Sequence, residues 1–189
     1  MGIVALLYCA ITAAEATLYQ EWAYRQLRAA TAQTTAVPSG TRYVPLDSVP
    51  DRSGAYADAG QGAPVAELEI PRIHVTAMVA EGASARVLRI AVGHVPGTAL
   101  PGQAGNVGLA AHRDSFFRQV GKLTAGDVIR LTTRNGQYEY RVGSTAIVGP
   151  EDVSVLNPSP NQTLTLVTCY PFYFVGSAPK RFIVRANRL

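Results

Sequence analysis

The sequence contains few of the residues that build metal centres and disulfide frameworks. Among its 189 residues there are only two cysteines and three histidines. Cys9 lies in an apolar N-terminal stretch and Cys169 lies near the C-terminus, so neither a disulfide framework nor a four-ligand zinc site is expected. We therefore predict no structural metal and no cofactor. The histidines, which also lack the spacing of metal ligands, are His74, His94 and His112.

A concentrated run of basic residues is also missing. The formal net charge is +4 at pH 7, but the lysines and arginines that follow residue 64 are scattered singly between apolar residues. A nucleic-acid-binding surface usually gathers such charges into a run or a helical stripe. The pattern therefore indicates a solvated basic surface, and nucleic acid is not an expected partner.

Charged residues are absent from the N-terminal range 2–14. This stretch is shorter than the roughly 20 residues that span a bilayer as a helix. Three interpretations stay open: the true start lies upstream, the helix continues past Glu15, or the stretch is a secretory signal. We interpret residues 1–28 as an N-terminal membrane anchor or uncleaved signal helix. Aromatic residues suited to a membrane interface follow the apolar stretch: Tyr19, Trp22 and Tyr24.

Large apolar residues are scarce in the range 29–64, which contains no Ile, Phe or Trp and is rich in Ala, Thr, Gly, Ser and Pro. Such a composition cannot bury enough apolar surface to order itself. We predict a flexible linker over 29–64. Fully extended, it would reach at most about 120 Å, which is enough to hold a domain clear of a membrane.

The remaining range, 65–189, consists of short β-like runs separated by Gly and Pro. Eight such runs are typical of an all-β barrel or sandwich, and Asn135 with Gly136 is the clearest hairpin signal. Two short helices are expected at 84–91 and 114–120, the second with Asp114 as its N-cap. The strands are expected at 65–70, 73–79, 107–112, 127–133, 137–143, 144–149, 163–169 and 181–187.

Cys169 is the candidate nucleophile because its thiol closes one of these β-runs. A thiol becomes a useful nucleophile only when a nearby cation or base favours the thiolate. His112 ends another strand-like segment, and Arg181 opens the last one, so the three side chains could meet at one rim of a barrel. There the Arg181 guanidinium could donate hydrogen bonds to a carbonyl oxygen that gains negative charge.

Each of these residues also has a structural interpretation. Cys169 could be a buried small hydrophobic residue, and His112 could be a rim residue whose hydrogen bonds are satisfied. Arg185 shares a strand face with Arg181, so either arginine could be the functional one. Asp114 fits a helix cap better than a residue that orients the histidine. The other two histidines look structural.

A resemblance to the sortase family of cysteine transpeptidases comes from the order His112, Cys169, Arg181. TLVTC closes one strand and RFIV opens the next. Two stretches resemble the class D branch in particular: GHVPGTALPGQAGNVGLAAHRDSFF at 93–117 and TLVTCYPFYFVGSAPKRFIVRA at 165–186. One departure is Ala111, where many relatives have Gly before the histidine.

The resemblance implies an eight-stranded sortase-type catalytic β-barrel over 65–189, preceded by an N-terminal apolar helix. Cys169 would attack the Thr carbonyl of an LPxTG-like sorting motif in a secreted protein, and the His112 imidazolium would protonate the leaving amine. Arg181 would steady the oxyanion, and Thr168 would help to shape the substrate pocket. The thioester would then be passed to an amine of the cell wall or of a pilin.

The resemblance also implies a location: a single-pass protein of the cytoplasmic membrane, with the enzyme on the outer side. Arg25 and Arg28 conflict with this, because the positive-inside rule would favour a cytoplasmic side for the chain after the apolar stretch.

Two alternatives remain. One is an L,D-transpeptidase-like acyl-transfer enzyme, although such enzymes typically have Arg directly after the cysteine and here Tyr170 and Pro171 follow. The other is a membrane-anchored β-barrel binding module in which Cys169 is buried and inert.

Overall fold

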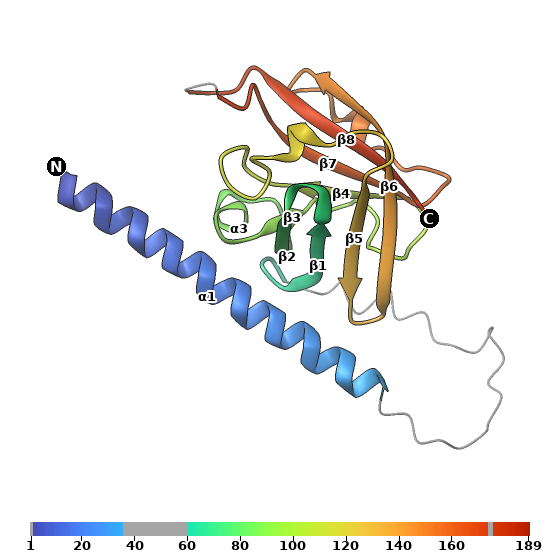
Figure 1. Cartoon of the computed structure of the whole chain (residues 1–189), viewed down its shortest axis with the longest axis horizontal. Helices are drawn as coiled ribbons and strands as arrows, with labels where there is room; N and C mark the ends of the chain where they lie inside the picture. Colours follow the sequence, from blue (N-terminus) through green and yellow to red (C-terminus); the bar gives the residue numbers. More distant parts are fainter. Residues whose placement is uncertain (1, 36–59, 174–175) are drawn as a thin grey trace.

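The computed structural model describes residues 2–35, 60–173 and 176–189, and Figure 1 shows a barrel with a long helix along one side. The strands close into a ring in the order β1-β2-β3-β4-β7-β8-β6-β5, which confirms the predicted all-β, eight-stranded barrel. The strands are β1 (Pro64–Ile70), β2 (Val75–Glu81), β3 (Val92–His94), β4 (Asn106–Ala110), β5 (Val128–Thr133), β6 (Gly136–Val148), β7 (Thr163–Tyr170) and β8 (Lys180–Arg188).

Alternating burial shows why these segments form a barrel wall. In β1, Leu68 and Ile70 are buried while Glu67 and Glu69 face outward, which is the two-residue period of a strand with one buried face. The inward side chains of all the strands meet in one core. Its largest fully buried members include Tyr140, Leu68, Ile70, Leu109, Ile129, Leu131, Leu164 and Leu166.

Two strands differ from their predictions. The predicted strands 137–143 and 144–149 are one strand, β6, whose pairing register shifts between Val142 and Ser144. Such a bulge bends a strand. Residues 136–141 of β6 pair with β5, and residues 140–148 pair with β8 on both sides of the bulge. Strand β3 was not predicted at all, because three residues are too few to show an alternation.

The predicted hairpin is present between β5 and β6. Its two loop residues are Arg134 and Asn135, one position earlier than expected, and Gly136 opens β6 opposite Thr133. The Thr133 hydroxyl accepts a hydrogen bond from the Asn135 N–H at 3.0 Å and donates one to the Gly136 carbonyl at 3.1 Å. The φ of 143° at Gly136 explains why glycine suits this position.

One of the two predicted short helices is correct. Helix α3 (Ala85–Ile90) falls within 84–91, and the Ser84 hydroxyl accepts a hydrogen bond from the Val87 N–H. The helix predicted at 114–120 is wrong: turns fill most of this range, so Asp114 caps no helix. Burial of Phe117 and the bond from its N–H to the His112 carbonyl, 3.3 Å long, hold the turn instead. The 3-10 helices are η2 (Pro71–Ile73), η3 (Val120–Lys122) and η4 (Val153–Leu156).

Helix α1 (Gly2–Thr35) continues past residue 28, where the predicted linker begins. The rest of that linker, 36–59, lies outside the described residues. Gln20 attaches the helix to the barrel: its side-chain amide donates to the Ile90 carbonyl at 2.8 Å and its oxygen accepts from the Met78 N–H at 2.6 Å. Ala23 and Leu27 are buried against Met78. The helix therefore packs on the barrel over this part of its length.

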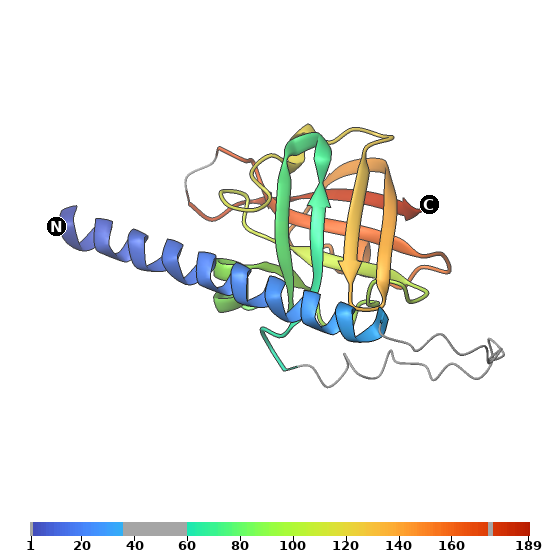
Figure 2. The ribbon, with the colours of Figure 1, turned by 60° about the horizontal axis from the view of Figure 1, so that its bottom comes forward.

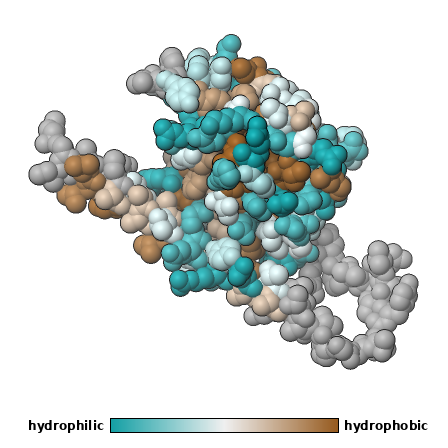
Figure 3. Space-filling view, in the orientation of Figure 1, coloured by the Kyte–Doolittle hydropathy of each residue, from teal (hydrophilic) through white to brown (hydrophobic). Residues whose placement is uncertain are grey.

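The N-terminal half of α1 extends away from the barrel, as Figure 2 shows. Figure 3 shows that this half is largely hydrophobic on its visible side. Within the described ranges, no helix combines the length and the apolar character needed to cross a bilayer. Exposed apolar side chains in this half of the helix include Val4, Leu6, Leu7 and Ile11.

Glu67 is partly buried, and burial disfavours the charged form of its carboxyl group. It lines a cavity of about 350 Å³ between α1 and the first two strands, together with Gln20, Glu21, Tyr24, Thr76, Ala77 and Met78. Burial raises the pKa of Glu67, an effect that Arg28 opposes and Glu69 reinforces. Because the folded state binds this proton more tightly than the unfolded state, stability falls as pH rises through the folded-state pKa.

We expect Glu67→Gln to raise the melting temperature at pH 7.5 by about 1 °C, a small effect because the carboxyl is still partly solvated. The gain should shrink at acidic pH, where Glu67 itself becomes protonated. Thermal unfolding followed by circular dichroism between pH 4 and 8 measures this. Glu69→Gln is the matched control, because Glu69 pairs with Arg130 at 3.5 Å and should not gain stability when neutralised. Equal or lower stability of Glu67→Gln at pH 7.5 would contradict the prediction.

Candidate active site

Strands β4 and β7 bring His112 to the level of Cys169. The two strands are parallel neighbours, and their register runs from Asn106 opposite Thr163 to Ala110 opposite Val167. A hydrogen bond of 3.3 Å from the Ala111 N–H to the Val167 carbonyl continues this pairing beyond β4. Extrapolated two residues beyond the pair Ala110 and Val167, this register puts His112 level with Cys169.

Strands β7 and β8 place Arg181 directly opposite Cys169 in an antiparallel ladder. Residues opposite one another in such a ladder project from the same face of the sheet. The guanidinium of Arg181 donates hydrogen bonds to the carbonyls of Ala178 and Lys180, at 3.2 and 3.0 Å. The three residues thus lie on three adjacent chain segments at one rim of the barrel, with His112 exposed and the other two half-buried.

Thr168 occupies the opposite face of β7 from Cys169. Its side chain is buried with those of Leu164 and Leu166, and alternate residues of a strand point to opposite faces. The Thr168 hydroxyl donates a 2.8 Å hydrogen bond to the carbonyl of Ala111. The role that the family resemblance implies for Thr168, shaping the substrate pocket, stays a prediction. In the structure, the Thr168 side chain holds the residue that precedes His112.

Arg185 lies farther along the outward face of β8, opposite Thr165. Its guanidinium donates a 2.7 Å hydrogen bond to the carbonyl of Val155 in η4. Of the two arginines left open by the sequence, Arg181 is therefore the one level with Cys169.

Arg113 is a rim residue that sequence reasoning missed. Its guanidinium donates hydrogen bonds to the carbonyls of Pro171 and Gly176, both at 2.9 Å. It thereby joins the turn after His112 to the loop after Cys169. The only signal in the sequence is its place directly after the histidine.

Aromatic rings fill the barrel end beside Cys169. The rings of Tyr170, Phe172 and Phe182 lie within 5.4 to 6.2 Å of one another, centroid to centroid. Phe172 also packs against Gly121, where a Cβ atom would lie only 2.5 Å from the ring. Glycine at 121 is therefore required for this close approach, which links η3 to the segment after Cys169.

The other two histidines lie outside this trio. His94 is buried, with Nδ1 2.7 Å from a Glu81 carboxylate oxygen and Nε2 3.0 Å from the Ala99 carbonyl oxygen. These bonds fit the structural interpretation of His94. His74 is exposed and follows η2 with a φ of 52°. Among residues 2–35, 60–173 and 176–189, no three His, Cys, Asp or Glu side chains are grouped as metal ligands would be.

A thiol beside an imidazole and a guanidinium is suited to acyl transfer, since the first can form a covalent acyl intermediate and the others can manage proton and charge. The fold and this rim together define a cysteine acyl-transfer enzyme on a β-barrel. The family model described as Sortase domain matches residues 68–189. The chain belongs to the sortase family.

Individual relatives agree with this assignment. The chain is 36% identical to Sortase D of Bacillus subtilis over 152 residues, which cover 80% of this chain and 75% of that protein. A Sortase D5 transpeptidase of Clostridium perfringens has a similar structure, with a TM-score of 0.66, 31% identity and coverage of 73% of this chain and 86% of that one. Sortase C of Clostridium perfringens gives a TM-score of 0.65, 30% identity and coverage of 71% and 75%.

These comparisons confirm the predicted family and enzyme class: the protein is a sortase-family cysteine transpeptidase. Neither the L,D-transpeptidase-like enzyme nor the inert binding module is supported by them.

Proposed function

We propose that the enzyme cleaves an LPxTG-like sorting motif of secreted proteins and transfers the acyl part to an amine of the cell wall or of a pilin. The observation that carries the proposal is the register that sets Cys169 opposite Arg181, on a strand that pairs with β4, the strand that leads into His112. Additional support comes from the similar Clostridium perfringens sortase C, whose structure contains the C-terminal cell wall sorting motif.

In the proposed reaction, the Cys169 thiolate attacks the Thr carbonyl carbon of the motif and forms a tetrahedral oxyanion. Arg181 donates hydrogen bonds to that oxyanion, where they are most valuable because the charge develops in the transition state. The His112 imidazolium gives its proton to the leaving amine as the peptide bond breaks. A thioester remains on Cys169. The acceptor amine attacks it, loses a proton to His112, and expels the thiolate as the new amide forms.

The test is to incubate the full chain with a library of LPxT-containing peptides and a primary amine, and to read the products by mass spectrometry. We expect an acyl-enzyme mass on Cys169 and an amide product, with hydrolysis when the amine is left out. Absence of cleavage across the library would overturn the proposal. Cleavage that gives only the hydrolysis product at high amine concentration would show a protease.

Arg181 and Arg185 should differ sharply in their contribution to activity. We expect Arg181→Ala to lower kcat/KM by about 100-fold, which is typical for loss of one oxyanion donor, while Arg185→Ala keeps most of it. Steady-state peptide cleavage measures both. Arg181→Lys should fall between the two, because lysine retains the charge and loses the planar fork. The reverse ranking of the alanine variants would assign the role to Arg185.

We also propose that the enzyme acts on the outer side of the cytoplasmic membrane, held there by its N-terminal helix as a single-pass anchor. The exposed apolar side chains of Val4, Leu6, Leu7 and Ile11 support an apolar contact for this half of α1. We expect fractionation of cells to find the protein in the membrane pellet and external protease to digest its barrel. A cytosolic pool, or a barrel protected until the membrane is opened, would contradict this topology.

A further inference from the structure

A second group of basic side chains gathers at the rim, around a cavity of about 450 Å³. Its lining is formed by Arg72, Ile73, His74, Gln119 and Lys122. The first three come from η2 and the residue after it, and the other two from η3 and the residue before it. Three of the five lining side chains are cations or can become cations, and a fourth is an amide that can donate hydrogen bonds.

Few acidic groups offset the positive charge of this cavity. One carboxylate pairs with a lining residue: the Oδ1 of Asp127 lies 3.9 Å from the Arg72 Nε. Its other oxygen accepts hydrogen bonds from the N–H and hydroxyl of Thr124, at 2.8 and 3.2 Å. Within the described part of the chain, no carboxylate lies within ion-pair distance of Lys122 or His74. The cavity therefore keeps a positive field, which favours an anionic ligand.

His74 stands in a backbone conformation that favours glycine. Its φ of 52° and ψ of 42° are left-handed, a region that residues other than glycine adopt rarely. This conformation directs the chain from η2 into β2 with the imidazole at the cavity.

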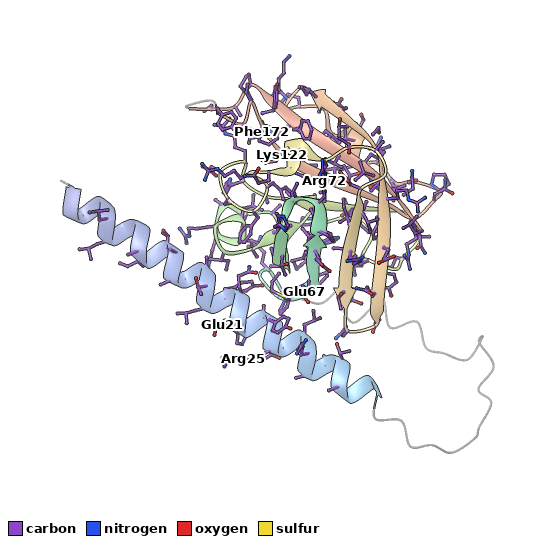
Figure 4. The ribbon with its side chains drawn as sticks, in the orientation of Figure 1. Glu21, Arg25, Glu67, Arg72, Lys122 and Phe172 are labelled. Atoms are coloured by element: carbon purple, nitrogen blue, oxygen red, sulfur yellow. The ribbon has the colours of Figure 1, made fainter. Side chains whose placement is uncertain are left out.

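The cavity lies at the same end of the barrel as Cys169. Strand β1 is antiparallel to β2, β2 is parallel to β3, β3 is antiparallel to β4, and β4 is parallel to β7. The strands β1, β4 and β7 therefore all run in one direction, and their C-terminal ends share one rim. The η2 turn follows the end of β1, as Cys169 lies at the end of β7. Figure 4 shows Arg72, Lys122 and Phe172 together on the part of the barrel remote from Glu21 and Arg25 of α1.

The segment that lines the cavity also touches the chain just after the nucleophile. Gly121 of η3 packs against the Phe172 ring, and three residues of extended chain span only about 10 Å between Cys169 and Phe172. We propose that the cavity holds a carboxylate or phosphate group of the acceptor, so that the amine at the other end of the same molecule reaches the thioester. This inference rests on the proposed transpeptidase function and specifies the chemical class of its second substrate: an amine that also carries an anionic oxygen group.

The test compares acceptors that differ only in the anionic group. Diglycine, triglycine and tetraglycine are each paired with the corresponding C-terminal amide, and phosphoethanolamine is paired with ethanolamine. The ratio of amide product to hydrolysis product is measured against acceptor concentration with the full chain. In the series whose anionic group fits the cavity, we expect the charged acceptor to reach half-saturation at about fivefold lower concentration than its uncharged partner. One or two partly exposed charge pairs can supply an effect of this size. A preference within the glycine series would assign a carboxylate, and one within the ethanolamine pair a phosphate.

Variants locate the preference. Arg72→Ala combined with Lys122→Ala should remove it, while the hydrolysis rate without amine stays unchanged because neither residue contacts the scissile bond. Arg118→Ala is the matched control, since Arg118 is an exposed cation of the same segment that does not line the cavity. Equal use of charged and uncharged acceptors, or a preference that survives the double variant, would overturn the inference.

A binding measurement separates this inference from the proposed function. NMR spectra of the full chain are recorded during titration with triglycine and with inorganic phosphate, in the absence of sorting peptide. We expect at least one probe to shift the signals of His74 and Gln119, and the Arg72, Lys122 double variant to show no such shifts. Absence of shifts with both probes in the wild-type chain would refute the anion site even if peptide cleavage proceeds. Shifts without any cleavage would instead refute the proposed function alone.

Discussion

Cys169→Ala should abolish peptide cleavage, with a loss of at least about 1,000-fold, since covalent catalysis has no substitute at this position. The thiol sits at the C-terminal end of β7, half-buried and opposite Arg181. An alanine fits the same space, so the variant should fold as the wild type does. Cleavage of a fluorogenic sorting peptide, followed with and without amine, is the measurement. Mass spectrometry should show that the variant no longer forms an acyl-enzyme.

The second cysteine provides the control for this prediction. Cys9→Ala should retain wild-type turnover, because Cys9 belongs to the N-terminal segment and not to the barrel. Alkylation gives an independent readout: iodoacetamide should inactivate the wild type in step with labelling of Cys169, and sorting peptide should protect it. Ordinary turnover by Cys169→Ala would assign the nucleophile to a different residue and remove the basis of the thioester mechanism.

Much of the rim could be predicted because its residues end or begin strands with clear local patterns. TLVTC and RFIV are runs of β-forming residues within β7 and β8, and one loop joins the two strands, so the opposition of Cys169 and Arg181 follows from nearby sequence. His112 is different. Its place beside Cys169 depends on parallel pairing between β4 and β7, segments that lie 57 residues apart. No local pattern reports such pairing: the place of His112 at a strand end made the meeting possible, and the resemblance to a family favoured it.

The incorrect predictions share a physical cause, which is the dominance of tertiary packing over local propensity. At 114–120 the pattern fits a helix, but burial of Phe117 and its bond to the His112 carbonyl favour turns. The same dominance of packing fixes a contact that local sequence does not report: the alternation of β7 turns Thr168 inward, where its hydroxyl donates a hydrogen bond to the Ala111 carbonyl. Arg113 was overlooked because its partners are backbone carbonyls of a distant loop.

Attachment of α1 was also beyond sequence reasoning. Residues 1–28 look like a separate helix because their composition differs from that of the barrel. The contact includes the side chain of Gln20, which satisfies the Met78 N–H and the Ile90 carbonyl, and the burial of Ala23 and Leu27 against Met78. A glutamine on a helix carries no sequence signal of such a role. The helix therefore belongs partly to the folded domain, and its position relative to the rim is set by these bonds.

His112→Ala should lower kcat/KM for the amide substrate by about 1,000-fold, which lies within the usual range for loss of a general acid. Two effects combine: the thiolate loses a neighbouring cation, and the leaving amine must depart without a proton. The variant can be tested with two substrates of one sequence, an ordinary peptide and a peptide thioester whose thiolate leaving group needs no proton. We expect the loss to be much smaller for the thioester substrate.

Added imidazole is the control for the role of the His112 side chain, because it can replace the ring that His112→Ala removes. Because the side chain is exposed at the rim, the cavity left by His112→Ala is open to solvent, and added imidazole should restore part of the activity toward the amide peptide. The same addition should leave Cys169→Ala inactive, which separates proton transfer from nucleophilic attack. If both substrates lose activity equally and imidazole restores nothing, His112 acts on the thiol alone and a different group protonates the amine. Ordinary turnover of the amide peptide by His112→Ala would remove this histidine from the reaction, despite its register beside Cys169.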